Sequence, residues 1–361
     1  MRDVDELIAA APYSVPAGEK EAVLTDLVAA LVEHHRQACP PYARMLEVLW
    51  PSASCARLAD VPWVPVGLFK THALRSVPEE EVVKTLTSSG TTGQAVSRIL
   101  LDTESTVRQT RALASIMRAA LGPERRSMVV VDARETVSNR ASFSARGAGI
   151  LGMATFGRDH FYALDGQMQL KRDELHEWLE RNSGRPLLLF GFTFMVWQHL
   201  LQQVRPGEID LSNAILIHSG GWKKLEEQAV GNAEFKAELR RVTGLEQVAN
   251  FYGMVEQIGT VYLECSNGRL HAPNFADVLI RDPVTWNVLP DGSPGVVEVV
   301  SPLPTSYPGH AILTEDRGRI SSRDDCGCGW LGATVELLGR VPKAELRGCS
   351  DTHAAELREA V

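Results

Sequence analysis

Short apolar runs alternate with longer amphipathic stretches along this 361-residue sequence, and this alternation restricts the folds that the chain can adopt. The apolar runs have the length of buried strands; they are 128–131, 187–190, 214–217 and 296–300. Apolar residues at helical spacing predict helices; these cover 19–37, 103–121, 172–182 and 222–241. Strands that alternate with helices predict an α/β architecture.

Composition and charge exclude several classes of protein. The chain is 44% hydrophobic and 23% charged, which is typical of a globular protein. The net charge is −8, and no basic block favours nucleic acid or an anionic membrane as a partner. The N-terminus carries Asp3, Asp5 and Glu6 where a signal peptide carries basic residues. No apolar run reaches the roughly 18–20 residues of a membrane span, so we expect a cytoplasmic location.

The domain organisation follows from the same pattern. Prolines and aromatic residues are frequent in the segment 40–78, so we expect it to be irregular and packed on the body of the protein. No linker is evident before residue 338. The sequence therefore predicts one large domain, 1–338, followed by a short hinge and tail, 339–361.

A loop of small polar residues follows the apolar stretch 82–86. It consists of Thr87, Ser88, Ser89, Gly90, Thr91, Thr92 and Gly93. Glycine lets phosphate oxygens approach backbone N–H groups, and hydroxyls add donors without bulk. The loop is therefore a candidate anion-binding site, although the same residue types also form ordinary surface turns. It lacks the Gly-Lys-Ser/Thr ending of a Walker loop.

Four further motifs occur downstream of this loop. They are Ser219-Gly220-Gly221-Trp222, Phe251-Tyr252-Gly253-Met254-Val255-Glu256, Leu313-Thr314-Glu315-Asp316 and Gly339-Arg340. In type and order, the five motifs resemble the signatures of the adenylate-forming superfamily, which includes acyl-CoA synthetases, nonribosomal adenylation domains and luciferases. The resemblance implies the N-terminal domain fold of these enzymes, in which mixed sheets with packed helices carry a small β subdomain.

The resemblance also implies a role for each motif in binding ATP. The loop 87–93 would hold the phosphates, and Gly220 and Gly221 would lie against adenine. The aromatic pair Phe251 and Tyr252, followed by Gly253 and Met254, would supply the ring that stacks on adenine. Glu256 would hold the magnesium ion, and Asp316 would bind the ribose hydroxyls. The implied chemistry is attack of a carboxylate on the α-phosphate, which produces an acyl-adenylate and pyrophosphate.

The chain departs from the superfamily pattern at two positions in these motifs. Gln94 follows Gly93 where a Pro-Lys-Gly sequence is usual. This loss of a lysine is typical of the branch that resembles phenylacetate-CoA ligase. Val255 stands where a threonine is usual, so one phosphate contact differs.

The end of the chain differs more strongly from the superfamily. Only 21 residues follow Arg340, at the hinge, where related enzymes carry a mobile lid domain with a late catalytic lysine. No lysine follows Lys343, and Cys349 directly follows Gly348. A thiol on a short tail could take the acyl group as a thioester, and Arg347 would favour its thiolate. The alternative is a buried cysteine that fills space.

The chain resembles the acyl-protein synthetases of the LuxE type over residues 60–353. The resemblance rests on the loop at 87–93, Phe-Tyr-Gly-Met-Val-Glu at 251–256, Ala-Ile-Leu-Thr-Glu-Asp at 311–316 and Arg-Gly-Cys-Ser at 347–350. It implies that Cys349 is acylated from a fatty or related acyl-adenylate and delivers the acyl group to a partner reductase.

Two other functions remain open at the level of sequence. One is an acyl- or aryl-CoA ligase of the phenylacetate type, with coenzyme A or a carrier protein as the acceptor. The other is a nucleotide-binding subunit without catalysis that supports a reductase, which the changes at Gln94 and Val255 would permit.

Four side chains form a candidate zinc site. They are Cys265, His271, Cys326 and Cys328. Three thiolates and one imidazole are a common ligand set for closed, structural zinc. The two pairs are far apart in sequence, and the alternative is four unrelated residues. If they meet, the site would stabilise the subdomain that carries Asp316.

The acyl-binding residues are less well defined by the sequence. The segments 139–161, with Ser142, Phe143, Gly147–Gly149 and Phe156, and 190–197, with Phe190, Phe192, Phe194 and Trp197, are apolar enough to line an acyl pocket or to form core. His218 ends a predicted strand and would face the substrate carboxylate or serve the fold, whereas His310 has no predicted role.

Overall fold

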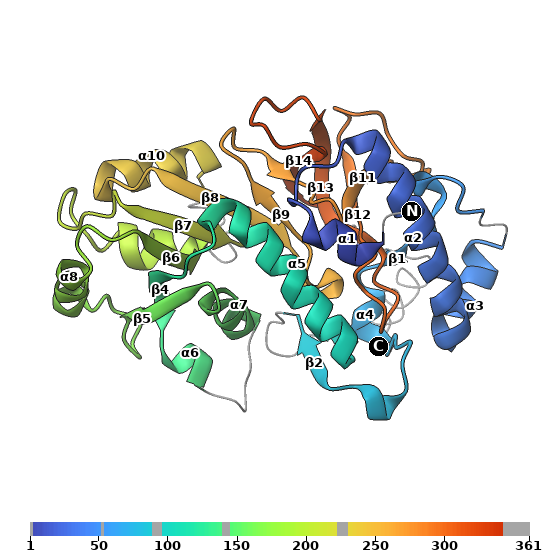
Figure 1. Ribbon diagram of the computed structural model, residues 1–361, viewed down its shortest axis with the longest axis horizontal. Helices are drawn as coiled ribbons and strands as arrows, with labels where there is room; N and C mark the ends of the chain where they lie inside the picture. Colours follow the sequence, from blue (N-terminus) through green and yellow to red (C-terminus); the bar gives the residue numbers. More distant parts are fainter. Residues whose placement is uncertain (1–2, 52–53, 89–95, 139–144, 222–229, 342–361) are drawn as a thin grey trace, which may run out of the picture.

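A computed structural model of the chain describes residues 3–51, 54–88, 96–138, 145–221 and 230–341. A twelve-stranded sheet crosses the whole molecule, in the order β11-β12-β13-β14-β10-β9-β8-β7-β6-β4-β5, with β1 paired to β13 (Figure 1). The strands, in chain order, are β1 (Val64–Pro65), β2 (Lys84–Thr87), β3 (Arg98–Leu101), β4 (Arg126–Ala133), β5 (Gly157–Leu164), β6 (Leu187–Phe192), β7 (Ala214–Ser219), β8 (Gln247–Gly253), β9 (Val261–Glu264), β10 (Leu270–His271), β11 (Asp277–Arg281), β12 (Gly295–Val300), β13 (Ala311–Arg323) and β14 (Ala333–Arg340). Strands β2 and β3 form a separate hairpin.

Helices cover both faces of this sheet. They are α1 (Val4–Ala9), α2 (Ala17–Ala38), α3 (Pro40–Leu49), α4 (Leu68–Thr71), α5 (Thr103–Leu121), α6 (Glu135–Ser138), α7 (Ala145–Ala154), α8 (Arg172–Arg181), α9 (Thr193–Val196) and α10 (Asn232–Thr243). Short turns of helix are η1 (Leu58–Asp60), η2 (Glu79–Glu81), η3 (Trp197–Leu201) and η5 (Val255–Gln257). No helix in these described ranges is long and apolar enough to cross a membrane.

The sheet has two halves that differ in strand direction. Strands β5, β4, β6, β7 and β8 are parallel to one another. From β8 through β9, β10, β14, β13 and β12 to β11 every pairing is antiparallel. The change of direction therefore occurs at the pair β8–β9, in the middle of the sheet.

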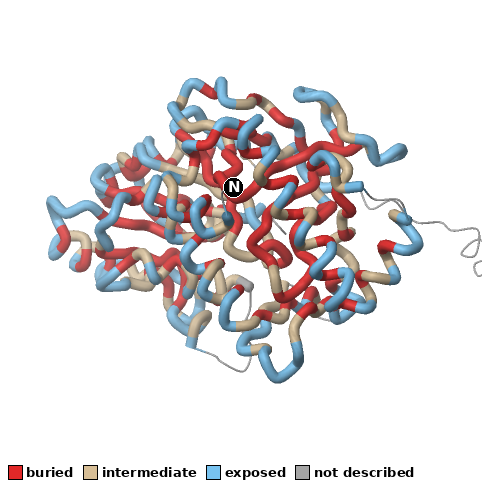
Figure 2. The backbone as a smooth tube through the Cα atoms, turned by 45° about the vertical axis from the view of Figure 1, so that its right-hand side comes forward, coloured by how far each residue is buried: buried red, intermediate tan, exposed pale blue. Residues whose placement is uncertain are grey.

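The central strands of the parallel half, β4, β6 and β7, are buried on both faces, which explains their continuous apolar runs. Alternate residues of β4, such as Met128 and Val130, pack with α5, whereas Val129 and Val131 pack with α8 and α10 on the opposite face. Figure 2 shows the buried residues following the strands through the middle of the molecule, with exposed residues on the outer helices and loops.

The structure confirms the α/β class and most of the predicted elements. The predicted helices 19–37, 103–121 and 172–182 correspond to α2, α5 and α8, and the four apolar runs lie in β4, β6, β7 and β12. The predicted helix 222–241 corresponds in part to α10, and 222–229 lie outside the described residues.

The prediction of an irregular segment over 40–78 is wrong in part. Residues 40–49 form the helix α3, with prolines in its first turn. Proline is compatible with that position because the first N–H groups of a helix have no partner within it. The predicted boundary between residues 338 and 339 falls inside β14.

Candidate functional site

The carboxyl ends of the parallel strands β7 and β8 form one wall of a cleft. The hydroxyl of Ser219, the last residue of β7, donates to the carbonyl oxygen of Phe251 in β8 at 2.9 Å. Gly220 follows with φ of +86°, which is unfavourable for residues with a side chain. A Cβ at Gly220 would lie 3.1 Å from the ring of Phe192. Glycine therefore lets the chain turn against this ring at the edge of the sheet.

Glu256 lies just beyond the end of β8, in the short helix η5. Its side chain lines the cleft, although the residue is only 5% exposed. Burial raises the pKa of the Glu256 carboxyl, while the positive charge of Lys70 acts in the opposite direction. A cation at this carboxylate would favour its ionised form.

The antiparallel half supplies the opposite wall. Thr314 to Asp316 belong to β13, and Gly339 and Arg340 lie beside them at the end of β14, where Asp316 pairs with Arg340. The guanidinium Nε of Arg340 lies 3.7 Å from Asp316 Oδ1. The Thr314 hydroxyl donates to the Val297 carbonyl at 2.7 Å, which fixes the start of this segment.

A hydrogen bond joins the two walls. Tyr252, from β8, donates its hydroxyl to Asp316 Oδ2 at 2.7 Å. Burial, followed by the nearby Asp316 charge, raises the pKa of Tyr252 well above its ordinary value. The phenol therefore stays protonated and acts as a donor to the carboxylate.

The cleft between these walls has a volume of about 750 Å³. Most of the predicted nucleotide-binding residues line it: Ser88, Ser219, Gly220, Gly221, Phe251, Tyr252, Gly253, Met254, Glu256, Asp316, Gly339 and Arg340. Thr87 lies in the neighbouring strand β2. Ser89 to Gly93 and Cys349 lie outside the described residues, as does Trp222.

The two ends of the polar loop are held together beside the cleft. The backbone N–H of Ser88 donates to the Ser97 carbonyl at 3.2 Å, and the N–H of Ser97 donates to the Ser88 hydroxyl at 2.9 Å. Strands β2 and β3, which flank the loop, pair from Lys84 with Leu101 to Thr87 with Arg98. A hairpin thus presents the loop from its base at Ser88, which itself lines the cleft.

Several cleft residues carried no signal in the sequence. They include Val66, Lys70, Thr193, Asn232, Phe235 and Asn250. Lys70 belongs to the segment for which the sequence predicted irregular structure, and no motif marks it. Its place depends on the pairing of β1 with the distant strand β13.

His218 lines the cleft but is only 2% exposed. Its Nδ1 lies 2.9 Å from the hydroxyl of Thr193, and burial lowers its pKa to about 3. Its Nε2 has no hydrogen-bond partner within the described part of the chain. The neutral imidazole therefore contributes both to the packing of β7 and to the surface of the cleft.

The residues suggested for an acyl pocket separate into two groups. Phe192 borders the cleft wall at Gly220, and a Cβ at Gly149 would lie 3.1 Å from the same ring. Phe190 is fully buried in the core, and the ring of Trp197 lies 6.2 Å from that of Phe235 on the face covered by α10. Ser142 and Phe143 lie outside the described residues.

The four candidate metal ligands converge in space. The ligand atoms of Cys265, His271, Cys326 and Cys328 all lie within 4.8 Å of one another. The Sγ atoms of Cys265 and Cys326 are 3.7 Å apart, and Cys328 Sγ is 3.4 Å from His271 Nε2. Tetrahedral ligands on Zn–S bonds of about 2.3 Å would have similar separations. The donor set and spacing fit a structural zinc ion.

This Cys/His cluster also anchors the N-terminal segment. Tyr13 stacks on Trp330, two residues after Cys328, with ring centroids 4.1 Å apart. The N–H of Leu331 donates to the Tyr13 carbonyl at 2.9 Å. Asp324 caps the start of α2 by accepting from the N–H of Ala17 at 2.9 Å. The loop 324–332 therefore connects the cluster, β13 and the N-terminal helices.

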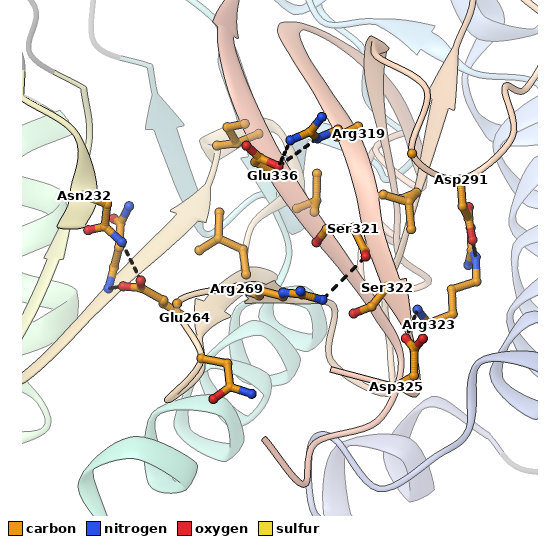
Figure 3. A pocket seen from close by; sticks show the side chains of 18 of the residues that line it. Asn232, Glu264, Arg269, Asp291, Arg319, Ser321, Ser322, Arg323, Asp325 and Glu336 are labelled. Atoms are coloured by element: carbon orange, nitrogen blue, oxygen red, sulfur yellow. Dashed lines mark hydrogen bonds and ion pairs between the residues drawn. The ribbon is translucent and has the colours of Figure 1, made fainter. Parts of the chain in front are cut away.

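A larger groove, of about 1250 Å³, lies on the outer side of β13 and β14. Figure 3 shows its charged side chains, which lie next to partners of opposite charge. Arg319 pairs with Glu336, and Arg323 pairs with Asp291. Glu264 accepts from Asn232 and Lys236. Because these charges satisfy one another, the groove is a weaker candidate for a nucleotide than the cleft.

Solved structures of adenylate-forming ligases share this fold. The chain superimposes on 2-hydroxyisobutyryl-CoA ligase in the postadenylation state with a TM-score of 0.69 at 19% identity, over 92% of this chain and 70% of that one. The same ligase in the thioesterification state gives a TM-score of 0.69 at 20% identity, over 95% of this chain and 73% of that one. The fold is that of an adenylate-forming ligase.

The sequence defines the family within this class. The model of the LuxE acyl-protein synthetase family matches residues 1–358, and the chain belongs to this family. A long-chain-fatty-acid–luciferin-component ligase of Vibrio harveyi is 24% identical over an alignment of 374 positions, which covers 96% of this chain and 92% of the relative. A ligase of the same name from Aliivibrio fischeri is 23% identical over 297 residues, which cover 81% of this chain and 77% of the relative. The chain is thus an ATP-dependent ligase that activates a carboxylic acid as its acyl-adenylate.

Proposed function

We propose that the chain activates a long-chain fatty acid and loads it on Cys349 as a thioester for a reductase partner. The main support for this proposal is the cleft of about 750 Å³, because it brings four separate nucleotide-binding motifs together. The family match and the names of the two luciferin-component ligases favour a fatty acid as substrate and a reductase as the recipient.

The residues of the cleft have complementary roles in this proposal. Gly220 and Tyr252 border adenine, Asp316 binds the ribose, and Ser88 leads into the loop Ser89–Gly93 that holds the phosphates. Glu256 would hold the magnesium ion of ATP, which neutralises phosphate charge when bound. A carboxylate oxygen forms a bond to the α-phosphorus while the bond from that phosphorus to the β-phosphate oxygen breaks, and pyrophosphate leaves.

Cys349 accepts the acyl group in the second step. It follows Arg340, at the rim of the cleft, by nine positions. Nine residues can span up to roughly 30 Å, which is ample for a return into the cleft. The thiolate forms a bond to the acyl carbon, the acyl–oxygen bond to AMP breaks, and AMP leaves. Arg347 and Arg340 would favour the thiolate form before attack.

Zinc at the Cys/His cluster is a second proposal. The ligand separations and the buried setting of Cys265, His271 and Cys326 support it. The ion would have a structural role, since four protein ligands leave no open position for substrate.

Self-acylation is tested by incubating the protein with ATP, Mg²⁺ and radiolabelled fatty acids of different lengths. We expect label that remains on the denatured protein and is released by hydroxylamine. Cys349→Ser should lose this label yet still catalyse ATP–pyrophosphate exchange, whereas the control Cys55→Ser, a half-buried cysteine outside the cleft, should retain it.

Each other outcome of this experiment identifies a different function. Label that persists in Cys349→Ser contradicts the proposed acceptor. Label that appears only on added coenzyme A or carrier protein indicates a ligase of the phenylacetate-CoA type. Absence of exchange with every acid would leave a nucleotide-binding subunit without catalysis.

A further inference from the structure

The charge of the cleft does not match the charge of its proposed ligand. ATP and a fatty carboxylate are both anions, yet the described lining includes the carboxylates of Glu256, Glu315 and Asp316. Within the described residues, the cations that line the cleft are Lys70 and Arg340. Arg340 lies 3.7 Å from Asp316, the carboxylate assigned to the ribose. Lys70, by contrast, lies 3.9 Å from Glu315, which has no assigned role in the cleft. Lys70 is therefore the side chain best placed to balance the phosphates.

The fold brings Lys70 to the cleft through a short parallel strand. Val64 and Pro65 of β1 pair with Ile312 and Leu313 of β13, and the N–H of Val66 donates to the Leu313 carbonyl at 2.9 Å. The chain then enters the single-turn helix α4. Lys70 is consequently held beside the segment of β13 that contains Glu315 and Asp316.

The residue before Lys70 fixes this turn of helix. Phe69 is 1% exposed, and its ring packs edge-on against Tyr307 with centroids 6.0 Å apart. Because Phe69 is anchored in the core, its neighbour projects to the cleft, where the Lys70 side chain remains 37% exposed. The buried Phe69 thus fixes the backbone position, while the ammonium is exposed enough to meet a ligand.

The contacts of the Lys70 ammonium suit a ligand-binding role better than a structural one. Its Nζ lies 3.9 Å from Glu315 Oε1, and the Glu315 side chain is 53% exposed. An exposed pair at this distance contributes little to stability. Lys70 also lies close enough to Glu256 to oppose the rise that burial causes in the pKa of that carboxyl, and both residues line the cleft with Ser88, the base of the polar loop.

We propose that Lys70 is a catalytic cation for acyl-adenylate formation, which contacts the β- and γ-phosphates of ATP and stabilises the leaving pyrophosphate. The proposal rests on the proposed function of the cleft. As the bond from the α-phosphorus to the bridging oxygen breaks, negative charge develops on that oxygen, and a fixed ammonium lowers the energy of this transition state. No proton is transferred. Lys70 therefore supplies a charge at the leaving group, in a chain that has Gln94 after its phosphate loop.

The test separates the two half-reactions. ATP–pyrophosphate exchange is measured for the wild type, Lys70→Ala, Lys70→Arg and the control Lys84→Ala, an exposed lysine on β2 outside the cleft. Loss of one transition-state donor typically lowers the rate by about 10²-fold, and we expect that decrease for Lys70→Ala. Lys70→Arg should recover to within about tenfold of wild type because it keeps the charge. The Tm of each variant is measured alongside.

A second measurement supplies chemically prepared fatty acyl-AMP in place of ATP and acid. Transfer of the acyl group to Cys349 should proceed at the wild-type rate in Lys70→Ala, because pyrophosphate is no longer involved. The inference is overturned if Lys70→Ala exchanges within twofold of wild type. It is also overturned if both half-reactions slow equally with a lower Tm, which would indicate a structural role. Absence of exchange in the wild type would instead refute the proposed function, and this inference with it.

Discussion

The two walls of the cleft are built on different structural principles. The wall from β7 and β8 consists of turns that follow parallel strands, and each strand is paired with a neighbour on both sides. The wall from β13 and β14 is part of an antiparallel sheet whose supports come from distant segments, namely β1, the Cys/His cluster and the N-terminal helices. The first wall is local in origin, whereas the second depends on contacts across the whole chain.

Because of this difference, the two walls should respond differently to substitutions. Substitutions at the parallel wall should change only the contacts that the substituted residue makes with the nucleotide. Loss of a remote support of the antiparallel wall should instead weaken a whole half of the sheet.

Loss of a metal ligand should affect the antiparallel half most strongly. Cys326→Ser removes one of four ligands, so bound zinc should fall from about one ion per chain to near none, because structural sites depend on their full ligand set. We expect a loss of about 3 kcal/mol and a Tm lower by about 4 °C. Metal analysis and calorimetry measure both quantities.

Cys55→Ser is the matched control, since Cys55 lies outside the cluster. Its zinc content and Tm should equal those of wild type. Limited proteolysis of Cys326→Ser should cut the segments after residue 265 first. A wild-type protein that is purified without zinc, under conditions that retain metals, contradicts the proposed site.

Removal of the bond between the walls should have an intermediate effect. Tyr252→Phe deletes the hydroxyl that donates to Asp316 Oδ2 at 2.7 Å and keeps the ring. A hydrogen bond to a charged group contributes about 1.5–3 kcal/mol, so KM for ATP should rise about tenfold. The exchange assay measures this change.

The control for this variant is Tyr162→Phe, at a half-buried tyrosine of β5 outside the cleft. It should leave KM unchanged. An unchanged KM in Tyr252→Phe would mean that Asp316 is held in place by the backbone of β13 alone. The two walls would then be independent.

Mild acid should produce the smallest effect, through buried histidines. His35, on α2, stacks on His310 with ring centroids 5.2 Å apart, and both are fully buried. Burial lowers the pKa of His310 to about 3 and holds that of His35 well below its ordinary value. In the unfolded chain each titrates near pH 6.5. The stability is therefore complete above about pH 6.5 and decreases as the pH falls toward 3.

Between pH 7.5 and 6 each buried histidine should reduce the free energy of unfolding by about 0.8 kcal/mol. Urea titrations at several pH values measure this slope, and His310→Gln should flatten it. Two of the buried histidines, His35 and His310, lie together beside α2 and β13, whereas His218 lies by itself in the parallel half. Hydrogen exchange in acid should therefore increase first around α2 and β13. A free energy of unfolding that is constant from pH 7.5 to 6 would contradict this reading.

The sequence predicted the parallel wall well because its signals are local. The apolar run over 214–217 lies in β7, and the predicted motif that follows it, Ser219 to Gly221, lines the cleft. Periodicity and turn residues are sufficient for such elements. The helix over 40–49 was missed because prolines were read as disrupting regular structure, although a first helical turn accepts them.

In the antiparallel half, the sequence indicated the wall motifs 313–316 and 339–340 through their family resemblance, and the metal ligands through their own chemistry. The cysteines drew attention to a metal site whose two halves meet through β10 and the loop after β13. Lys70 could not be found in this way, because an isolated lysine has no distinctive chemistry. Its position is created by the pairing of Val64 with Ile312, a tertiary contact that no local pattern encodes.

The attachment of the N-terminal segment has a consequence for the order of folding. The N–H of Ser14 donates to Asn274, 260 positions further along, and the N–H of Ala17 donates to Asp324, 307 positions further along. At about 5–20 residues per second, a ribosome needs roughly 15–60 s to make those acceptors after the donors have emerged. During that interval α2 has no sheet to pack against and its apolar face is exposed to chaperones. The first residues to be synthesised are therefore among the last to fold.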